Sequence, residues 1–182
     1  MQDVVPSPTD KLAWHEERLE LPLPPAEVYA RLDGAALESL LPGTRRLPGV
    51  VATEPLNDIA FPAPGARRRV RLADGNSAVE QVLENRPNAY FAYQVWAYTS
   101  PEARPVHYAK GEFWYLPAAA GCTLRWRYSF HLRGNRFPGL LGPVGRALFT
   151  RVFLDRTYAE FMRSCLAAIE GYVLASGAGL SD

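Results

Sequence analysis

The chain has 182 residues, of which 48% are hydrophobic and 21% charged, as is typical of one globular domain. Its 20 basic and 19 acidic residues leave a net charge of +1, which gives no electrostatic reason to expect nucleic acid or an anionic membrane surface as a partner. No apolar run reaches the roughly 18 residues of a membrane span, and the first ten residues do not resemble a signal peptide. We therefore expect a cytoplasmic monomer or homodimer with no membrane insertion.

The cysteines and histidines argue against a metal or cofactor site. Cys122 and Cys165 are far apart, and His15, His107 and His131 fall in no ligand spacing. Glycine-rich phosphate-binding motifs and the nucleophile-elbow motif are also absent from the sequence. We expect no cofactor and no metal.

The N-terminal part predicts a strand followed by two short helices. Residues 1–10 are read as a disordered tail and residues 12–21 as a strand. A helix follows over residues 25–32, with proline near its first position, and a second over residues 35–41. Asp33-Gly34 and Pro42-Gly43 end the two helices.

The middle of the chain reads as a series of strands joined by short turns. Such a succession predicts an antiparallel meander, curved if it is to cover one long element. The expected strands are residues 49–54, 58–61, 67–73, 78–85, 89–98, 107–116 and 122–132.

The last element is a long helix over residues 144–174. Leu154, Tyr158, Phe161, Cys165, Ile169 and Tyr172 recur at spacings of three or four and form one apolar stripe. At 1.5 Å per residue the helix measures about 45 Å, enough to cross the sheet. The order of elements is that of an α+β domain over residues 11–175, with a second disordered tail at 176–182.

Four segments stand out in chain order: LPLPPAEVY at 21–29, GARRRV at 65–70 with Asp74-Gly75, VEQVL at 79–83 and GCTLRW at 121–126. Together they resemble the SRPBCC superfamily, the START/birch-pollen-allergen-like helix-grip fold, and especially its polyketide cyclase/dehydrase-like branch. The resemblance covers nearly the whole chain. It implies a curved antiparallel sheet of about seven strands around the C-terminal helix, two short helices after the first strand, and an apolar cavity between sheet and helix.

The high aromatic content, 12% of residues, has a candidate place on the inner face of that sheet. Alternation along residues 122–132 puts Trp126 and Tyr128 inside, opposite Tyr158 and Phe161 of the helix. In residues 89–98 both faces are aromatic. Phe91, Tyr93 and Val95 are expected inward, which leaves Trp96 and Tyr98 on the convex face, where they would form a partner surface.

Glu80 is the polar residue singled out for the cavity. A buried carboxylate needs a partner, and Arg68 on the preceding strand or Lys110 on a later one would supply it. Lys110 and Glu112 share a face with Tyr108 and Trp114, so either that face lines the cavity or Phe113 and Tyr115 point inward instead. The candidate ligand-binding residues are Arg68, Val70, Glu80, Val82, Phe91, Tyr93, Tyr108, Lys110, Trp126, Tyr128, Tyr158 and Phe161.

Three functions remain open. The first is binding of a small apolar molecule, such as a lipid, polyketide, quinone or sterol-like compound, as a carrier or sensor. The second is a polyketide cyclase, aromatase or dehydratase with Glu80 as the base that takes a proton next to a carbonyl. The third is a protein-interaction module that uses the convex aromatic residues.

Overall fold

The computed structural model describes residues 6–7 and 9–175. Within the N-terminal tail expected over 1–10, Asp10 accepts a hydrogen bond from the Tyr108 hydroxyl. The predictions for residues 1–5, 8 and 176–182 lie outside the described residues.

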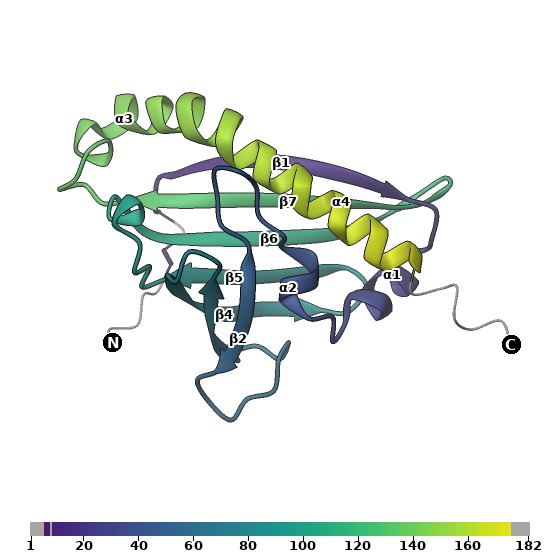
Figure 1. Cartoon of the computed structure of the whole chain (residues 1–182). Helices are drawn as coiled ribbons and strands as arrows, with labels where there is room; N and C mark the ends of the chain where they lie inside the picture. Colours follow the sequence, from purple (N-terminus) through teal and green to yellow (C-terminus); the bar gives the residue numbers. More distant parts are fainter. Residues whose placement is uncertain (1–5, 8, 176–182) are drawn as a thin grey trace, which may run out of the picture.

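Seven antiparallel strands form one sheet in the order β1-β7-β6-β5-β4-β3-β2, so the predicted α+β helix-grip architecture is confirmed (Figure 1). The helices α1 (Pro25–Leu32) and α2 (Leu37–Leu40) follow the first strand, as expected. The strands are β1 (Leu12–Leu21), β2 (Val50–Pro55), β3 (Arg67–Leu72), β4 (Ser77–Arg86), β5 (Tyr90–Trp96), β6 (Val106–Ala118) and β7 (Gly121–Leu132).

The strand expected at 58–61 is wrong. These residues belong to a loop between β2 and β3. The Asn57 side chain donates to the Gly65 carbonyl and accepts from the Arg67 amide, so it closes the loop on itself. Pro62 and Pro64, which have no amide hydrogen, further interrupt any strand pairing here.

The predicted C-terminal helix is confirmed, with one irregularity. It runs through α3 (Gly142–Phe149), a π-helical segment (Thr150–Tyr158) and α4 (Ala159–Ala175). Five of the six predicted stripe residues are buried, and at the C-terminal end Val173 is buried in place of the half-exposed Tyr172. No helix in the described part of the chain is long and apolar enough to cross a membrane.

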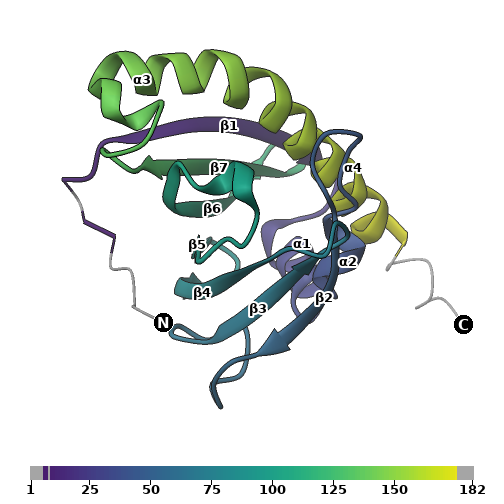
Figure 2. The same cartoon turned by 60° about the vertical axis from the view of Figure 1, so that its left-hand side comes forward.

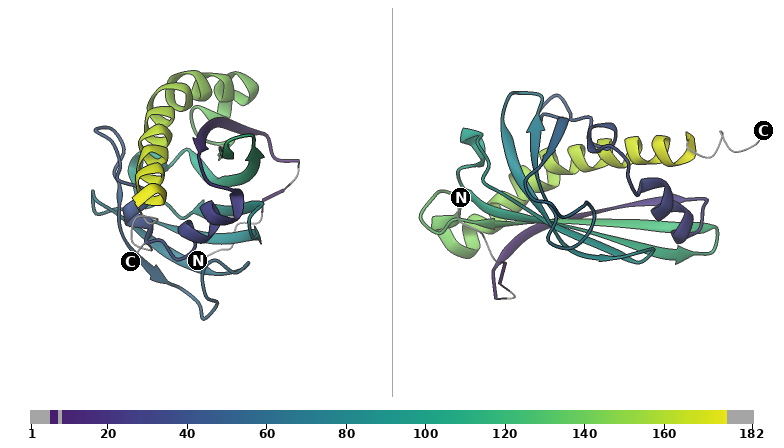
Figure 3. Two further views of the ribbon diagram at one scale, coloured as in Figure 1. Left: turned by 90° about the vertical axis from the view of Figure 1, so that its right-hand side faces the viewer. Right: turned by 90° about the horizontal axis from the view of Figure 1, so that it is seen from below.

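The sheet curls around this helix, as Figures 2 and 3 show. Register shifts interrupt the pairing of β2 with β3, β4 with β5, and β6 with β7, and such bulges bend and twist a strand. Because α4 covers one part of the concave face and α1 and α2 lie near one end of it (Figure 1), the rest of that face is left to surround a cavity.

Candidate functional site

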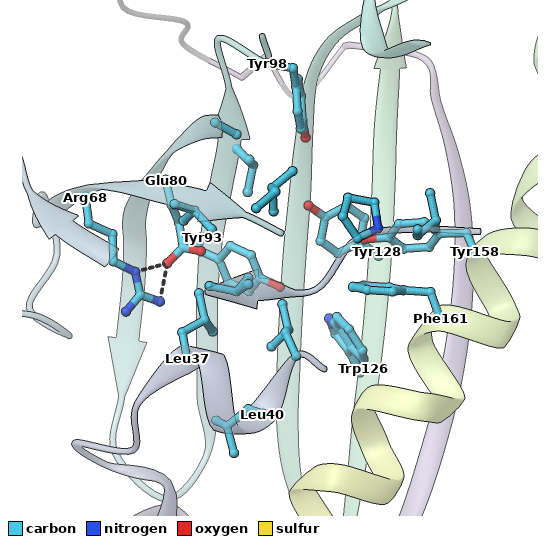
Figure 4. Close-up of a pocket in the computed structure, with 18 of the residues that line it drawn as sticks. Leu37, Leu40, Arg68, Glu80, Tyr93, Tyr98, Trp126, Tyr128, Tyr158 and Phe161 are labelled. Carbon is cyan, nitrogen blue, oxygen red and sulfur yellow. Dashed lines mark hydrogen bonds and ion pairs between the residues drawn. The ribbon is translucent and has the colours of Figure 1, made fainter. Parts of the chain in front are cut away.

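A cavity of about 930 Å³ lies between the concave face of the sheet and the C-terminal helix. This volume falls in the range of small-molecule sites. Leu37 and Leu40 of α2 line it on one side, and the short helical turn Pro101–Ala103 lines it on another. Figure 4 shows many of the lining side chains. From the sheet and the helix come Arg68, Val70, Ala78, Glu80, Phe91, Tyr93, Val95, Phe113, Trp126, Tyr128, Phe149, Phe153, Tyr158 and Phe161.

Strand pairing decides which aromatic residues face the cavity. Tyr93 of β5 and Tyr128 of β7 both pair with Gly111 of β6, and the Tyr93 ring lies across that glycine. A Cβ atom at position 111 would lie 2.2 Å from Tyr93 Cζ. Only a residue without a side chain leaves room for this approach, so Gly111 positions one wall of the cavity.

The same register corrects two candidate residues. The structure places Tyr108 and Lys110 on the convex face, so they do not line the cavity. Lys110 donates to Glu112 at 2.7 Å, and Tyr108 packs against Val79 and Trp96. Of the two alternatives for this strand, the structure has Phe113 and Tyr115 pointing inward. The sequence left both open because β6 carries aromatic residues on both faces.

Val82 and Tyr98 also differ from expectation. Val82 is fully buried but is not among the residues that line the cavity. Tyr98 lines the cavity, because Ala97 adopts a φ of +53° and thereby breaks the alternation along the chain. Trp96 is on the convex side as expected, yet it is only 2% exposed. The proposed partner surface of Trp96 and Tyr98 is therefore not formed.

Glu80 and Arg68 form the predicted ion pair at the cavity wall. They are direct partners across β3 and β4, and Arg68 Nε and Nη2 approach Glu80 Oε1 at 2.9 Å and 2.7 Å (Figure 4). The guanidinium also lies 3.8 Å from the centroid of the Phe61 ring. Burial raises the pKa of the Glu80 carboxyl, and the charge and hydrogen bond of Arg68 oppose that rise.

Four tyrosines supply hydroxyl groups to an otherwise apolar wall. Burial raises the pKa values of Tyr93, Tyr98, Tyr128 and Tyr158, so these groups remain protonated and able to donate. Among the described residues, neither the Tyr98 hydroxyl nor Trp126 Nε1 makes a hydrogen bond of good geometry, although both atoms are buried and interact with Tyr128 and Tyr93, respectively. A buried polar atom without a well-formed hydrogen bond is costly, and a ligand oxygen would relieve that cost.

The sequence reasoning missed Phe149 and Phe153. In a π-helix the hydrogen bonds join residues five apart, so such residues lie near one another. The ring centroids of Phe153 and Tyr158 are 5.8 Å apart, and those of Phe149 and Phe153 are 5.0 Å apart. Phe149 and Phe153 are four residues apart, but Phe153 and Tyr158 are five apart. A search for the α-helical spacings of three and four therefore does not place all three residues on one face. Within the described residues, no cluster of side chains suited to a metal ion is present.

Solved structures with the same fold include Ara h 8.0201, with a TM-score of 0.63 and 18% identity over 91% of this chain and 99% of that one. Norcoclaurine synthase from Thalictrum flavum, in complex with dopamine and hydroxybenzaldehyde, has a TM-score of 0.63 and 14% identity over 96% of this chain and 98% of its own.

The di-domain aromatase/cyclase StfQ of steffimycin biosynthesis has a TM-score of 0.63 and 16% identity over 92% of this chain, which spans 52% of StfQ. No curated protein sequence matches the chain. A family model described as "Polyketide cyclase / dehydrase and lipid transport" matches residues 15–170. The chain therefore belongs to the polyketide cyclase/dehydrase and lipid transport family.

Proposed function

We propose that the protein binds a small, largely apolar molecule in the cavity between sheet and helix and acts as its carrier or sensor. The observation that carries the proposal is the cavity itself: about 930 Å³, walled by aromatic rings and holding buried polar atoms that make no hydrogen bond of good geometry in the described structure. Apolar walls with a few placed polar groups are the usual composition of a ligand site.

The walls favour a flat ligand with an oxygen substituent. The rings of Phe113 and Trp126 stack with centroids 5.0 Å apart at 13°, and Tyr128 and Tyr158 stand 4.9 Å apart. Such surfaces pack well against planar rings. Tyrosine hydroxyls and Trp126 Nε1 would donate to a carbonyl or hydroxyl oxygen. A polyketide, a quinone or a sterol-like molecule meets both requirements.

Native mass spectrometry of gently purified protein, followed by organic extraction, tests this proposal. We expect an added mass that disappears on extraction. The extracted protein is then titrated with a hydroxynaphthoquinone while tryptophan fluorescence is followed. Tyr98→Phe and Tyr128→Phe should weaken binding, whereas Tyr172→Phe, in α4 and not among the cavity-lining residues, should not. A protein that carries nothing and does not bind the quinone would contradict the proposal.

A second candidate function is cyclisation or dehydration of a polyketide-like substrate. It is favoured by the buried Glu80 carboxyl, whose raised pKa suits a base that takes a proton next to a carbonyl. A tyrosine hydroxyl would hold the developing enolate oxygen. Turnover lost in Glu80→Gln with binding retained would support an enzyme. Binding without turnover in either form would support a carrier.

A cytoplasmic location and a monomeric or homodimeric state stay predictions.

A further inference from the structure

The segment that leads into the C-terminal helix carries apolar side chains on the outside of the molecule. We call residues 133–156 the elbow; it contains the turn Gly139–Leu141, α3 and most of the π-helical segment. In Figure 1 it extends past the end of the sheet. Six of its apolar side chains are between 41% and 70% exposed: Phe137, Leu140, Leu141, Val144, Leu148 and Val152.

These side chains form one stripe and are distinct from the cavity wall. Val144, Leu148 and Val152 recur every four residues along the helix that begins at Gly142, so they lie on one side of it. Leu140 precedes them in the turn Gly139–Leu141. The other side packs inward: Phe149 and Phe153 line the cavity, and Gly145 is buried, where a Cβ atom would lie 1.8 Å from the Pro138 carbonyl oxygen. The elbow helix is therefore apolar both inside and outside. Exposed apolar patches on soluble domains commonly mark a docking surface.

The charge of the elbow indicates what would dock there. It contains five arginines and one acidic residue, Asp155, and Asp155 already bonds to His15 Nδ1. Arg136, Arg146, Arg151 and Arg156 form no ion pair within the described residues. The net charge of +1 for the whole chain thus conceals a local excess of +4 in 24 residues. The helical turn Pro101–Ala103 and the residue after it add no net charge to this excess, since the charges of Glu102 and Arg104 cancel.

We propose that the elbow docks onto an anionic lipid membrane surface, with the apolar stripe at the boundary of headgroups and acyl chains and the arginines on lipid phosphates. Basic side chains flanking an apolar helical face are the composition of interfacial helices. A second copy of the chain fits less well, because two elbows would bring like charges together. Docking would place the helix that carries Phe149 and Phe153, and hence one cavity wall, at the lipid surface.

Vesicle co-sedimentation tests the proposal without any ligand, so its failure is distinguishable from failure of the ligand-binding proposal. The probes are vesicles of phosphatidylcholine alone and of phosphatidylcholine with phosphatidylglycerol. We expect binding to the anionic vesicles, weakened by salt. Arg146→Gln with Arg151→Gln should weaken vesicle binding about 25-fold. Each basic residue near an anionic membrane surface contributes ~1 kcal/mol, which is about fivefold in affinity. Leu140→Gln with Val144→Gln should weaken binding on the order of tenfold.

Two double variants on another surface serve as controls. Arg69→Gln with Arg71→Gln removes the same charge from β3, and Val51→Gln with Ile59→Gln removes exposed apolar side chains elsewhere. Both should bind vesicles like the unmodified protein. Equal binding to neutral and anionic vesicles, or equal losses in elbow and control variants, would overturn the proposal. So would a dimer without lipid that the elbow variants abolish, because the stripe would then be a protein interface.

Discussion

The concave and convex faces of the sheet contain the same kinds of residue in opposite arrangements. On the concave face, Trp126 is 1% exposed and stacks on Phe113. On the convex face, Trp14 is 51% exposed and lies under the guanidinium of Arg127, 4.7 Å from its ring centroid. Trp126 thus helps to build an apolar wall, whereas Trp14 lies at the surface against an arginine. Aromatic content alone does not identify a binding site.

The charged residues differ in the same way. At the cavity wall on the concave face, Arg68 and Glu80 form an ion pair whose side chains are both largely buried. On the convex face Glu16 accepts from Arg127 at 2.9 Å and Lys110 pairs with Glu112 at 2.7 Å, and each of these pairs includes a side chain more open to solvent. Because solvent screens exposed pairs, the concave pair is the one whose loss should affect stability and binding together.

Truncation of a tryptophan on each face should separate the two faces most clearly. Trp126→Ala should cost about 3–5 kcal/mol of unfolding free energy, as for other buried aromatic residues. Trp14→Ala should cost about 0.5–1 kcal/mol, the value of an exposed cation–π contact. Urea unfolding followed by circular dichroism measures both. Equal costs would mean that the two faces do not differ as described.

Removal of a cation from each face gives the next largest difference. Arg68→Leu leaves the Glu80 carboxylate buried without its partner and should cost about 3 kcal/mol. Lys110→Met should cost less than about 1 kcal/mol, because the pair with Glu112 is partly solvated. The unfolding free energies of the two variants, measured in the same buffer, test this. A Lys110 variant as unstable as the Arg68 variant would contradict the expectation.

A glycine-to-alanine change tests the close packing of the concave wall. Gly111→Ala would force the Tyr93 ring to move and should cost about 1–3 kcal/mol, as for other overpacked cores. Gly171→Ala, in α4, is the matched control: a Cβ there meets nothing within 4 Å, and alanine should stabilise the helix by about 0.5–1 kcal/mol. Thermal unfolding of both variants should therefore shift in opposite directions. Two shifts of the same sign would refute the account of Gly111.

The stability contributed by Glu80 should depend on pH with a defined sign. Its pKa is raised in the folded protein above the ordinary 4.5, chiefly by burial. Folding is then favoured by Glu80 when the carboxyl is protonated, below about pH 4.5, and this contribution is lost as the pH rises through the folded-state pKa. The stability of the unmodified protein relative to Glu80→Gln should fall between pH 4 and pH 8. A rise over that range would show that Arg68 dominates and that the pKa is lowered.

The sequence predicts the strands and the long helix because alternation, turn residues and helical spacing are local signals. It also places Trp126 and Tyr128 inward. The errors fall where the backbone departs from regular geometry or where both faces of a strand are equally aromatic. Tyr98 turns inward through the positive φ of Ala97, and Phe153 lies on a π-helical segment. The side of β6 that faces the cavity depends on its pairing with β5 and β7, which no pattern within β6 encodes.

The most direct test of the central claim is binding of the fluorescent apolar probe ANS to folded protein whose cavity has been filled. Val95 lines the cavity, whereas Val51 is 54% exposed on β2, so Val95→Phe and Val51→Phe add the same side chain inside and outside. We predict saturable binding to the unmodified protein and to Val51→Phe, and binding weakened on the order of tenfold, about 1.4 kcal/mol, in folded Val95→Phe. Equal affinity in all three proteins would contradict the claim that the concave face encloses the ligand site.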